Sequence, residues 1–135
     1  MELASGARYV SLPCLEAVMV RGRLTMNAAQ RALFEAVGRS GKLIFSTGGD
    51  TISANLVGVF TVRRHGKEDR LDVDDGTHHV HVKWHRVARA EIGTSGGEGL
   101  LTFWNGNDLL FELFRPAGSF PAEVEALVGE LMAPS

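Results

Sequence analysis

The stretch LLTFWNGNDLLFELF, residues 100–114, indicates that strands form the second half of this chain. Two segments rich in leucine and phenylalanine flank the polar residues Asn105 to Asp108. The Asn105-Gly106 pair is a strong hairpin signal, because a tight turn between strands needs residues that tolerate a positive φ. The stretch therefore predicts two antiparallel strands joined by a short turn.

Upstream of this hairpin, apolar and polar residues alternate with a period of two, which is typical of strands. We expect these strands at residues 42–47, at 52–64 with Gly58 as a candidate bulge, at 71–74 as a short segment, at 78–84 and at 88–92. Polar turns at 65–70 and 93–99 separate some of them. About six strands thus follow one another without a helix between them, so the sheet should be largely antiparallel.

A helix is expected to begin after Asn27 and to end near Gly38 and Gly41. Asn27 is a good N-cap, and Gln30 stands at the N3 position, which gives the pattern of a capping box. Apolar residues then recur at helical spacing, at Leu33, Phe34 and Val37. The two glycines are typical of a helix C-terminus.

A second helix is expected within residues 119–132, with Ser119 as its cap and Pro121 in its first turn. Its apolar stripe follows the i, i+3, i+4, i+7 pattern, at Val124, Leu127, Val128 and Leu131. This stripe should face the core, and a shared dimer interface is the alternative. The fold class is therefore α+β, with one largely antiparallel sheet covered by N- and C-terminal helices.

The length of 135 residues predicts a single domain, spanning 1–135. The 44% hydrophobic and 22% charged residues are close to the globular average, and the net charge of −2 argues against a nucleic-acid partner. No apolar run approaches the roughly 20 residues that span a bilayer, so no membrane partner is expected. The lone Cys14 fits a reducing compartment, and the N-terminus lacks the pattern of a signal peptide. We expect a cytoplasmic protein.

Four of the five histidines fall within HHVHVKWH, residues 78–85. Strand alternation places His78 with Val80, Val82 and Trp84 on one face, and His79, His81, Lys83 and His85 on the other. The Cβ atoms of His79 and His81 should lie about 6–7 Å apart, which lets both imidazoles approach one metal ion. Zinc and haem iron both take imidazole ligands, whereas a solvated strand face needs no ligand at all.

Three functions stay open on these residues alone. The first is a haem-binding site. The second is a metal-dependent enzyme that uses zinc or iron at the His79/His81 pair, although no carboxylate follows at the spacing of a cupin motif. The third is a non-catalytic domain for dimerisation or partner binding. No motif of a nucleophilic or phosphate-binding enzyme is present, so an enzyme is the less favoured interpretation.

The second half of the chain resembles the haem-utilisation carriers of the HutX/ChuX kind and the half-repeat of HemS-type haem-trafficking proteins. Four segments carry the resemblance in the family's order over about residues 42–131: HVHVK, VARAEI, the hairpin with its Asn105-Gly106 tip, and PAEVEAL. The family often places a tyrosine-bearing segment before the histidine strand and a second histidine in an early strand. This chain has no tyrosine before that strand except Tyr9, and Phe45 stands near the place of the second histidine.

The resemblance implies a HemS/HutX-like domain with a split-barrel-like antiparallel sheet, commonly a homodimer, that binds haem or a related tetrapyrrole in the cytoplasm. His81 matches the position of the axial iron ligand. The resemblance makes His79 a second ligand or pocket donor and Lys83 a partner of the haem propionates. His85 joins this cofactor-binding set if the chain turns toward the site after Trp84.

Overall fold

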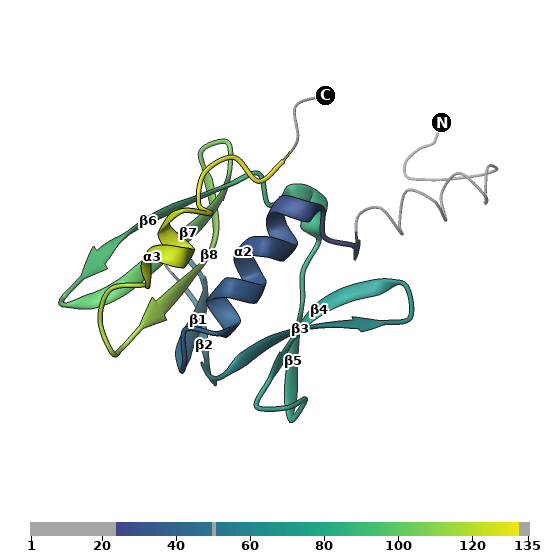
Figure 1. Cartoon of the computed structure of the whole chain (residues 1–135), viewed down its shortest axis with the longest axis horizontal. Helices are drawn as coiled ribbons and strands as arrows, with labels where there is room; N and C mark the ends of the chain where they lie inside the picture. The colour runs from purple at the N-terminus through teal and green to yellow at the C-terminus, as the bar shows by residue number, and fades with distance from the viewer. Residues whose placement is uncertain (1–23, 50, 133–135) are drawn as a thin grey trace.

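The computed structural model describes residues 24–49 and 51–132, and Cys14 lies outside them. These residues form eight strands, two α-helices and one 3-10 helix (Figure 1). In chain order they are α2 (Ala28–Gly38), β1 (Leu43–Gly48), β2 (Ser53–Gly58), β3 (Phe60–His65), β4 (Glu68–Val73), β5 (His78–His81), η1 (Trp84–Arg86), β6 (Arg89–Ser95), β7 (Glu98–Asn105), β8 (Asp108–Arg115) and α3 (Ala122–Glu125).

The strands form two sheets, with the orders β2-β1-β8-β7-β6 and β3-β4-β5. Every strand pairing in both sheets is antiparallel. The α+β class and the antiparallel pairing are thus confirmed, but the predicted single sheet is two. Figure 1 shows α2 across the middle of the molecule, with β6, β7 and β8 on one side of it and β3, β4 and β5 on the other.

The predicted strand at 52–64 is wrong in one respect, because the chain leaves the first sheet at Gly58 and enters the second at Phe60. Gly58 is therefore the end of β2 and not a bulge. A Cβ at Gly58 would lie 2.6 Å from Val73 Cγ1 and 2.7 Å from Asp74 Oδ1, so glycine is needed for close approach. Asp74 stabilises the segment that connects the two sheets, since its carboxylate accepts a hydrogen bond from the Val59 N–H at 2.9 Å.

The N-terminal helix is confirmed together with its capping box. The Asn27 side chain accepts a hydrogen bond from the Gln30 N–H, and the Gln30 side chain accepts one from the Asn27 N–H. The helix ends at Gly38, as expected. A capping box of this kind contributes on the order of 1 kcal/mol to helix stability.

The C-terminal helix is shorter than predicted, because α3 covers only Ala122–Glu125. Its N-cap is Pro121 without a side-chain cap, so the expected role of Ser119 is wrong. Gly129 adopts a φ of 133°, which ends helical geometry, and the chain then pairs with the start of β6. Of the predicted stripe, Val124 and Leu131 are buried, Val128 is half-buried and Leu127 is exposed.

The core is built around phenylalanine rings. Phe103 and Phe111 pair across β7 and β8 with ring centroids 4.5 Å apart, and Phe45 of β1 stacks on Phe111 at 4.9 Å. Phe34 of α2 packs on Phe103 and on Trp84, at 5.0 Å in each case. Aromatic pairs of this geometry contribute about 0.5–1.5 kcal/mol each beyond their burial, so this cluster joins the helix to the larger sheet and to η1.

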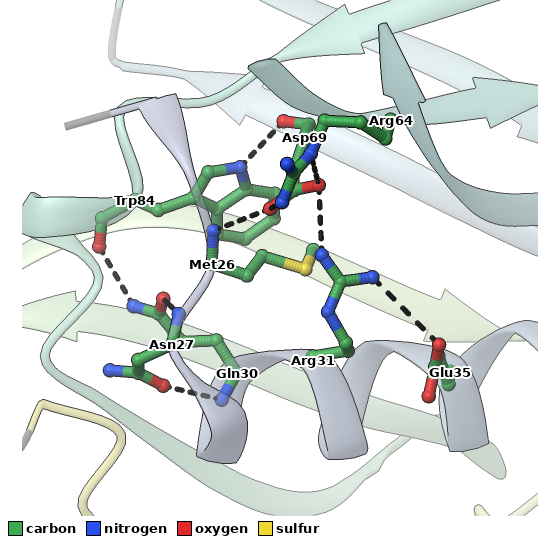
Figure 2. Close-up of polar contacts among 8 residues, drawn as sticks. All are labelled: Met26, Asn27, Gln30, Arg31, Glu35, Arg64, Asp69 and Trp84. Atoms are coloured by element: carbon green, nitrogen blue, oxygen red, sulfur yellow. Dashed lines mark hydrogen bonds and ion pairs between the residues drawn. The ribbon is translucent and has the colours of Figure 1, made fainter. Parts of the chain in front are cut away.

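Asp69 of β4 is a fully buried carboxylate that joins the second sheet to α2 (Figure 2). It accepts hydrogen bonds from the Met26 N–H at 2.8 Å and from Arg64 Nε at 2.6 Å, and Arg31 Nη2 lies 2.8 Å away. Burial alone would raise the pKa of Asp69, but the hydrogen bonds from Arg64, Met26 and Arg31 hold that pKa below its ordinary value. The group is therefore a buried anion with its partners in place.

The segment after β5 is fixed by two side chains from opposite sides (Figure 2). The Trp84 indole N–H donates to the Asp69 carbonyl at 2.7 Å. The buried Gln30 amide donates to the carbonyls of Trp84 and Val87 at 2.8 and 2.9 Å. Because Gln30 is also part of the capping box, the start of α2 and the segment 84–87 are held by one residue. This segment forms one wall of the site described next.

Candidate functional site

The histidine segment is a short strand followed by a 3-10 turn, and not the predicted strand to Trp84. β5 covers His78–His81 and pairs with β4, with His79 opposite Asp72 and His81 opposite Arg70. The predicted alternation holds within the strand, where Val80 is half-buried against the core and His79 and His81 are exposed. Sequence placed His78 with the core-facing set, and it lies exposed at the strand's start. Lys83 and His85 lie beyond the strand.

An apolar pocket of about 260 Å³ lies where the two sheets approach each other. β1 and β8 of the larger sheet line one side, and β5 with the segment up to residue 87 lines the other. Its apolar residues are Phe45, Val80, Val82, Val87, Leu110 and Phe111. The remaining lining residues are Thr47, His81, Lys83 and Arg86. The pocket thus combines an apolar interior with one imidazole and two cations, which is the usual character of a small-molecule site.

His81 is the only imidazole among the residues that line this pocket. Its Nδ1 lies 2.5 Å from Glu68 Oε2, and its side chain is 57% exposed. Since a carboxylate only accepts hydrogen bonds, Nδ1 carries the proton of this bond, and in a neutral imidazole Nε2 is then the nitrogen with a lone pair. Metal-ligating histidines usually donate their second ring N–H to a carboxylate, a backbone carbonyl or a water, and the His81–Glu68 pair has the first of these arrangements.

The other predicted site residues divide into two groups. Lys83 lines the pocket together with His81. His79 lies outside the lining, but its ring contacts His81 edge-on at 4.8 Å between centroids. His85 lies exposed in η1 and does not line the pocket. The structure therefore brings His81 and Lys83 to one cavity, leaves His79 as a neighbour, and places His85 elsewhere because the strand ends before it.

The pocket residues fit the requirements of a haem site. A haem site needs one or two axial side chains, an apolar slot and cations near the propionates. His81 offers the ligand, the rings of Phe45 and Phe111 offer apolar surface, and Lys83 and Arg86 offer the cations. The volume of about 260 Å³ is below the roughly 300–1,000 Å³ of most ligand pockets, so the pocket can take only one edge of a macrocycle, with the rest of the ring toward solvent.

Sequence reasoning missed Glu68 and Arg86. Glu68 was assigned to a polar turn at 65–70, whereas that turn is only residues 66–67 and Glu68 begins β4. A signal was present in the sequence, because the polar Arg70 and Asp72 alternate with the apolar Leu71 and Val73, and the same strand pattern extends back to Glu68. Arg86 gave no signal, since only the turn of η1 brings it to the pocket.

The outer face of the second sheet carries a further histidine. His65 was expected in a surface turn and is the last residue of β3, with its Nε2 3.5 Å from Asp72 Oδ2. Asp72 also accepts a hydrogen bond from Arg70 Nε at 3.2 Å. Within residues 24–49 and 51–132, no group of three or more His, Cys, Asp or Glu side chains is arranged to hold a metal ion. The His79/His81 pair thus lacks a third protein ligand in the described chain.

Comparisons with known proteins give information on the fold of this chain but not on its function. No protein-family model matches the chain, and no curated protein does. Among solved structures, a protein from Erwinia carotovora matches over 78% of this chain and 73% of its own, with a TM-score of 0.50 and 13% identity. No helix in the described part of the chain is long and apolar enough to span a membrane. At this identity the likeness concerns the fold alone: the chain shares an α+β arrangement with the Erwinia carotovora protein.

Proposed function

We propose that this protein binds haem or a related tetrapyrrole in the pocket between its sheets and serves as a cytoplasmic carrier or store of haem. The observation that carries the proposal is the position of His81, at an apolar pocket and hydrogen-bonded to Glu68 through Nδ1. The sequence resemblance to HutX/ChuX carriers also supports it, and on that ground we propose that the fold is of the HemS/HutX-like type.

Each pocket residue has a role in this proposal. His81 would ligate the haem iron through Nε2, and the apolar walls would exclude water from the bound edge of the macrocycle. Lys83 and Arg86 bind the propionates, because a carboxylate is stabilised by cations at a partly desolvated rim. His79 orients the His81 ring through their edge-on contact. When bound, the haem iron supplies the coordination position that His81 fills.

A hemin titration followed by absorbance tests the proposal. The wild-type protein should give a sharpened and shifted Soret band, and His81→Ala should bind at least about tenfold more weakly. His78→Ala is the matched control, since His78 lies exposed on the same strand and outside the pocket, and it should bind like wild type. An unshifted Soret band with wild-type protein, or equal binding by His81→Ala, contradicts the proposal.

A divalent metal site at His79 and His81 is the second candidate, favoured by the 4.8 Å separation of their rings. Metal analysis of the purified protein, together with the titration, separates the two candidates. Bound zinc or iron that is lost in His79→Ala, with no hemin response, favours a metal-dependent enzyme. If neither ligand binds, a non-catalytic interaction domain remains. The expected homodimer is checked by light scattering on the same samples.

A further inference from the structure

Building on the proposed haem site, we propose that Glu68 is a positioning residue for His81. It holds the imidazole in its Nδ1–H tautomer and makes the site favour ferric over ferrous haem. The inference rests on the contact between these two residues, their exposures and the register of β4 and β5. Glu68 does not line the pocket, and it contacts the Nδ1 atom of His81.

The register of the second sheet brings the two side chains together. Arg70 of β4 is the direct partner of His81 on β5, and Glu68 lies two residues before Arg70, so it shares the same outer face. Glu68 is thus the diagonal neighbour of His81, and its Oε2 lies 2.5 Å from Nδ1. Arg70 contacts a different carboxylate, because its Nε donates to Asp72 at 3.2 Å.

The pair is shielded on the Glu68 side and open on the His81 side. The Glu68 side chain is 20% exposed, whereas the His81 side chain is 57% exposed. A carboxylate with few water contacts forms a stronger hydrogen bond to its partner than a fully hydrated one. The bond therefore fixes the ring through Nδ1, and more than half of the His81 side chain stays open to a ligand.

The charge of Glu68 has an electronic consequence for His81. A carboxylate that accepts the Nδ1–H hydrogen bond draws the proton toward itself and raises the basicity of Nε2 as a ligand. A more strongly donating ligand stabilises the more highly charged iron. Glu68 should therefore increase the affinity for ferric haem relative to ferrous haem, beyond its effect on the orientation of the ring.

Two variants separate orientation from charge. Glu68→Gln keeps a carbonyl that can accept from Nδ1–H but removes the negative charge. Glu68→Ala removes both. Glu125→Gln is the control for the loss of one carboxylate, because Glu125 is exposed on α3 and outside the pocket. Each variant is examined by ¹⁵N NMR of the imidazoles without hemin at pH 8, by hemin titration, and by redox titration of the hemin complex.

We expect wild type and Glu68→Gln to show His81 as the Nδ1–H tautomer, and Glu68→Ala to lose it. Glu68→Ala should bind hemin about 10–100-fold more weakly. Glu68→Gln should bind hemin within about threefold of wild type, but its preference for ferric over ferrous haem should fall about tenfold. For one electron this corresponds to a rise in midpoint potential of about 59 mV. Glu125→Gln should match wild type in all three measurements.

The outcomes distinguish this inference from the proposed function. If hemin binds in a His81-dependent way but the potential of Glu68→Gln is unchanged, the electronic role is overturned. If the tautomer of His81 is the same in Glu68→Ala as in wild type, the positioning role is overturned. If wild-type protein does not bind hemin, both this inference and the proposed function fail together.

Discussion

Replacing Asp69 by asparagine should lower the free energy of unfolding by about 3 kcal/mol. Asp69 is the buried carboxylate to which the start of α2 and the strands β3 and β4 are joined. Asparagine has the same shape, so the change leaves packing intact, removes the charge and replaces one acceptor by an NH₂ donor. The cost therefore reports the polar contacts alone.

The size of this loss in unfolding free energy follows from the hydrogen-bond and ion-pair partners of Asp69. Oδ2 accepts from the Met26 N–H at 2.8 Å, and an asparagine oxygen placed there can keep this bond. The amide NH₂ then takes the place of Oδ1, which faces Arg31 and Arg64, and a buried donor without an acceptor costs about 1–3 kcal/mol. The two arginine side chains are 36% and 52% exposed, so each lost ion pair contributes at most about 1 kcal/mol.

Urea unfolding followed by circular dichroism measures the change. For a domain of this size a loss of about 3 kcal/mol lowers the melting temperature by roughly 10 °C. Asp75→Asn is the matched control, because the Asp75 side chain is 96% exposed and its substitution should stay within about 0.5 kcal/mol. A wild-type midpoint for Asp69→Asn, with an unchanged m-value, would refute the assignment of Asp69 as a buried anion that stabilises the fold.

Three further predictions concern the same framework. Gly58→Ala should destabilise the fold by about 1–3 kcal/mol in urea unfolding, because its Cβ would lie 2.6 Å from Val73 Cγ1, while Gly93→Ala, with no atom within 4 Å, should be neutral. Gln30→Ala should cost about 2–4 kcal/mol by the same assay, since two buried carbonyls lose their donor. The pKa of Asp69 is lower in the folded state than in the unfolded one, so the stability that its charge contributes is complete above about pH 5 and is lost as the pH falls below about 4. In Asp69→Asn, the free energy of unfolding should therefore fall less steeply with decreasing pH in this acidic range than it does in the wild type.

Local signals predicted the elements whose determinants are close in sequence. The capping box of Asn27 and Gln30 identified α2 because both of its hydrogen bonds join residues three apart. The β7–β8 hairpin was predicted for the same reason. Its turn consists of residues 106 and 107, and Gly106 adopts the positive φ of 60° that the sequence pattern required.

The sequence predictions that were wrong concern features that depend on residues distant in the sequence. Residues 52–64 alternate throughout, and alternation does not reveal that the chain changes sheets at Gly58, since that depends on contact with Val73 and Asp74. Similarly, the helical stripe after Pro121 continues in the sequence, but Gly129 turns the chain toward β6.

The sequence predicted the candidate ligand of the site, but not the pocket or the hydrogen-bond partner of that ligand. Strand alternation placed His81 on the outer face, and the resemblance singled it out as a ligand. The pocket beside it needs Phe45 and Phe111 from the other sheet, and its hydrogen bond needs Glu68, thirteen residues away. Such contacts depend on how the sheets pack, which no local pattern encodes.

The location of the pocket between two separate sheets has a mechanical consequence. In the described chain no ladder of backbone hydrogen bonds joins β3-β4-β5 to the other five strands, so side chains and two connecting segments keep them in place. A molecule held by Phe111 on one side and His81 on the other would act as a cross-link. Its binding energy would add to the resistance of the two sheets to separation, by about 2.7 kcal/mol at a hundred times its Kd. Amide hydrogen exchange in both sheets would then slow together when this molecule binds, so that the bound molecule would also be a structural element of the protein.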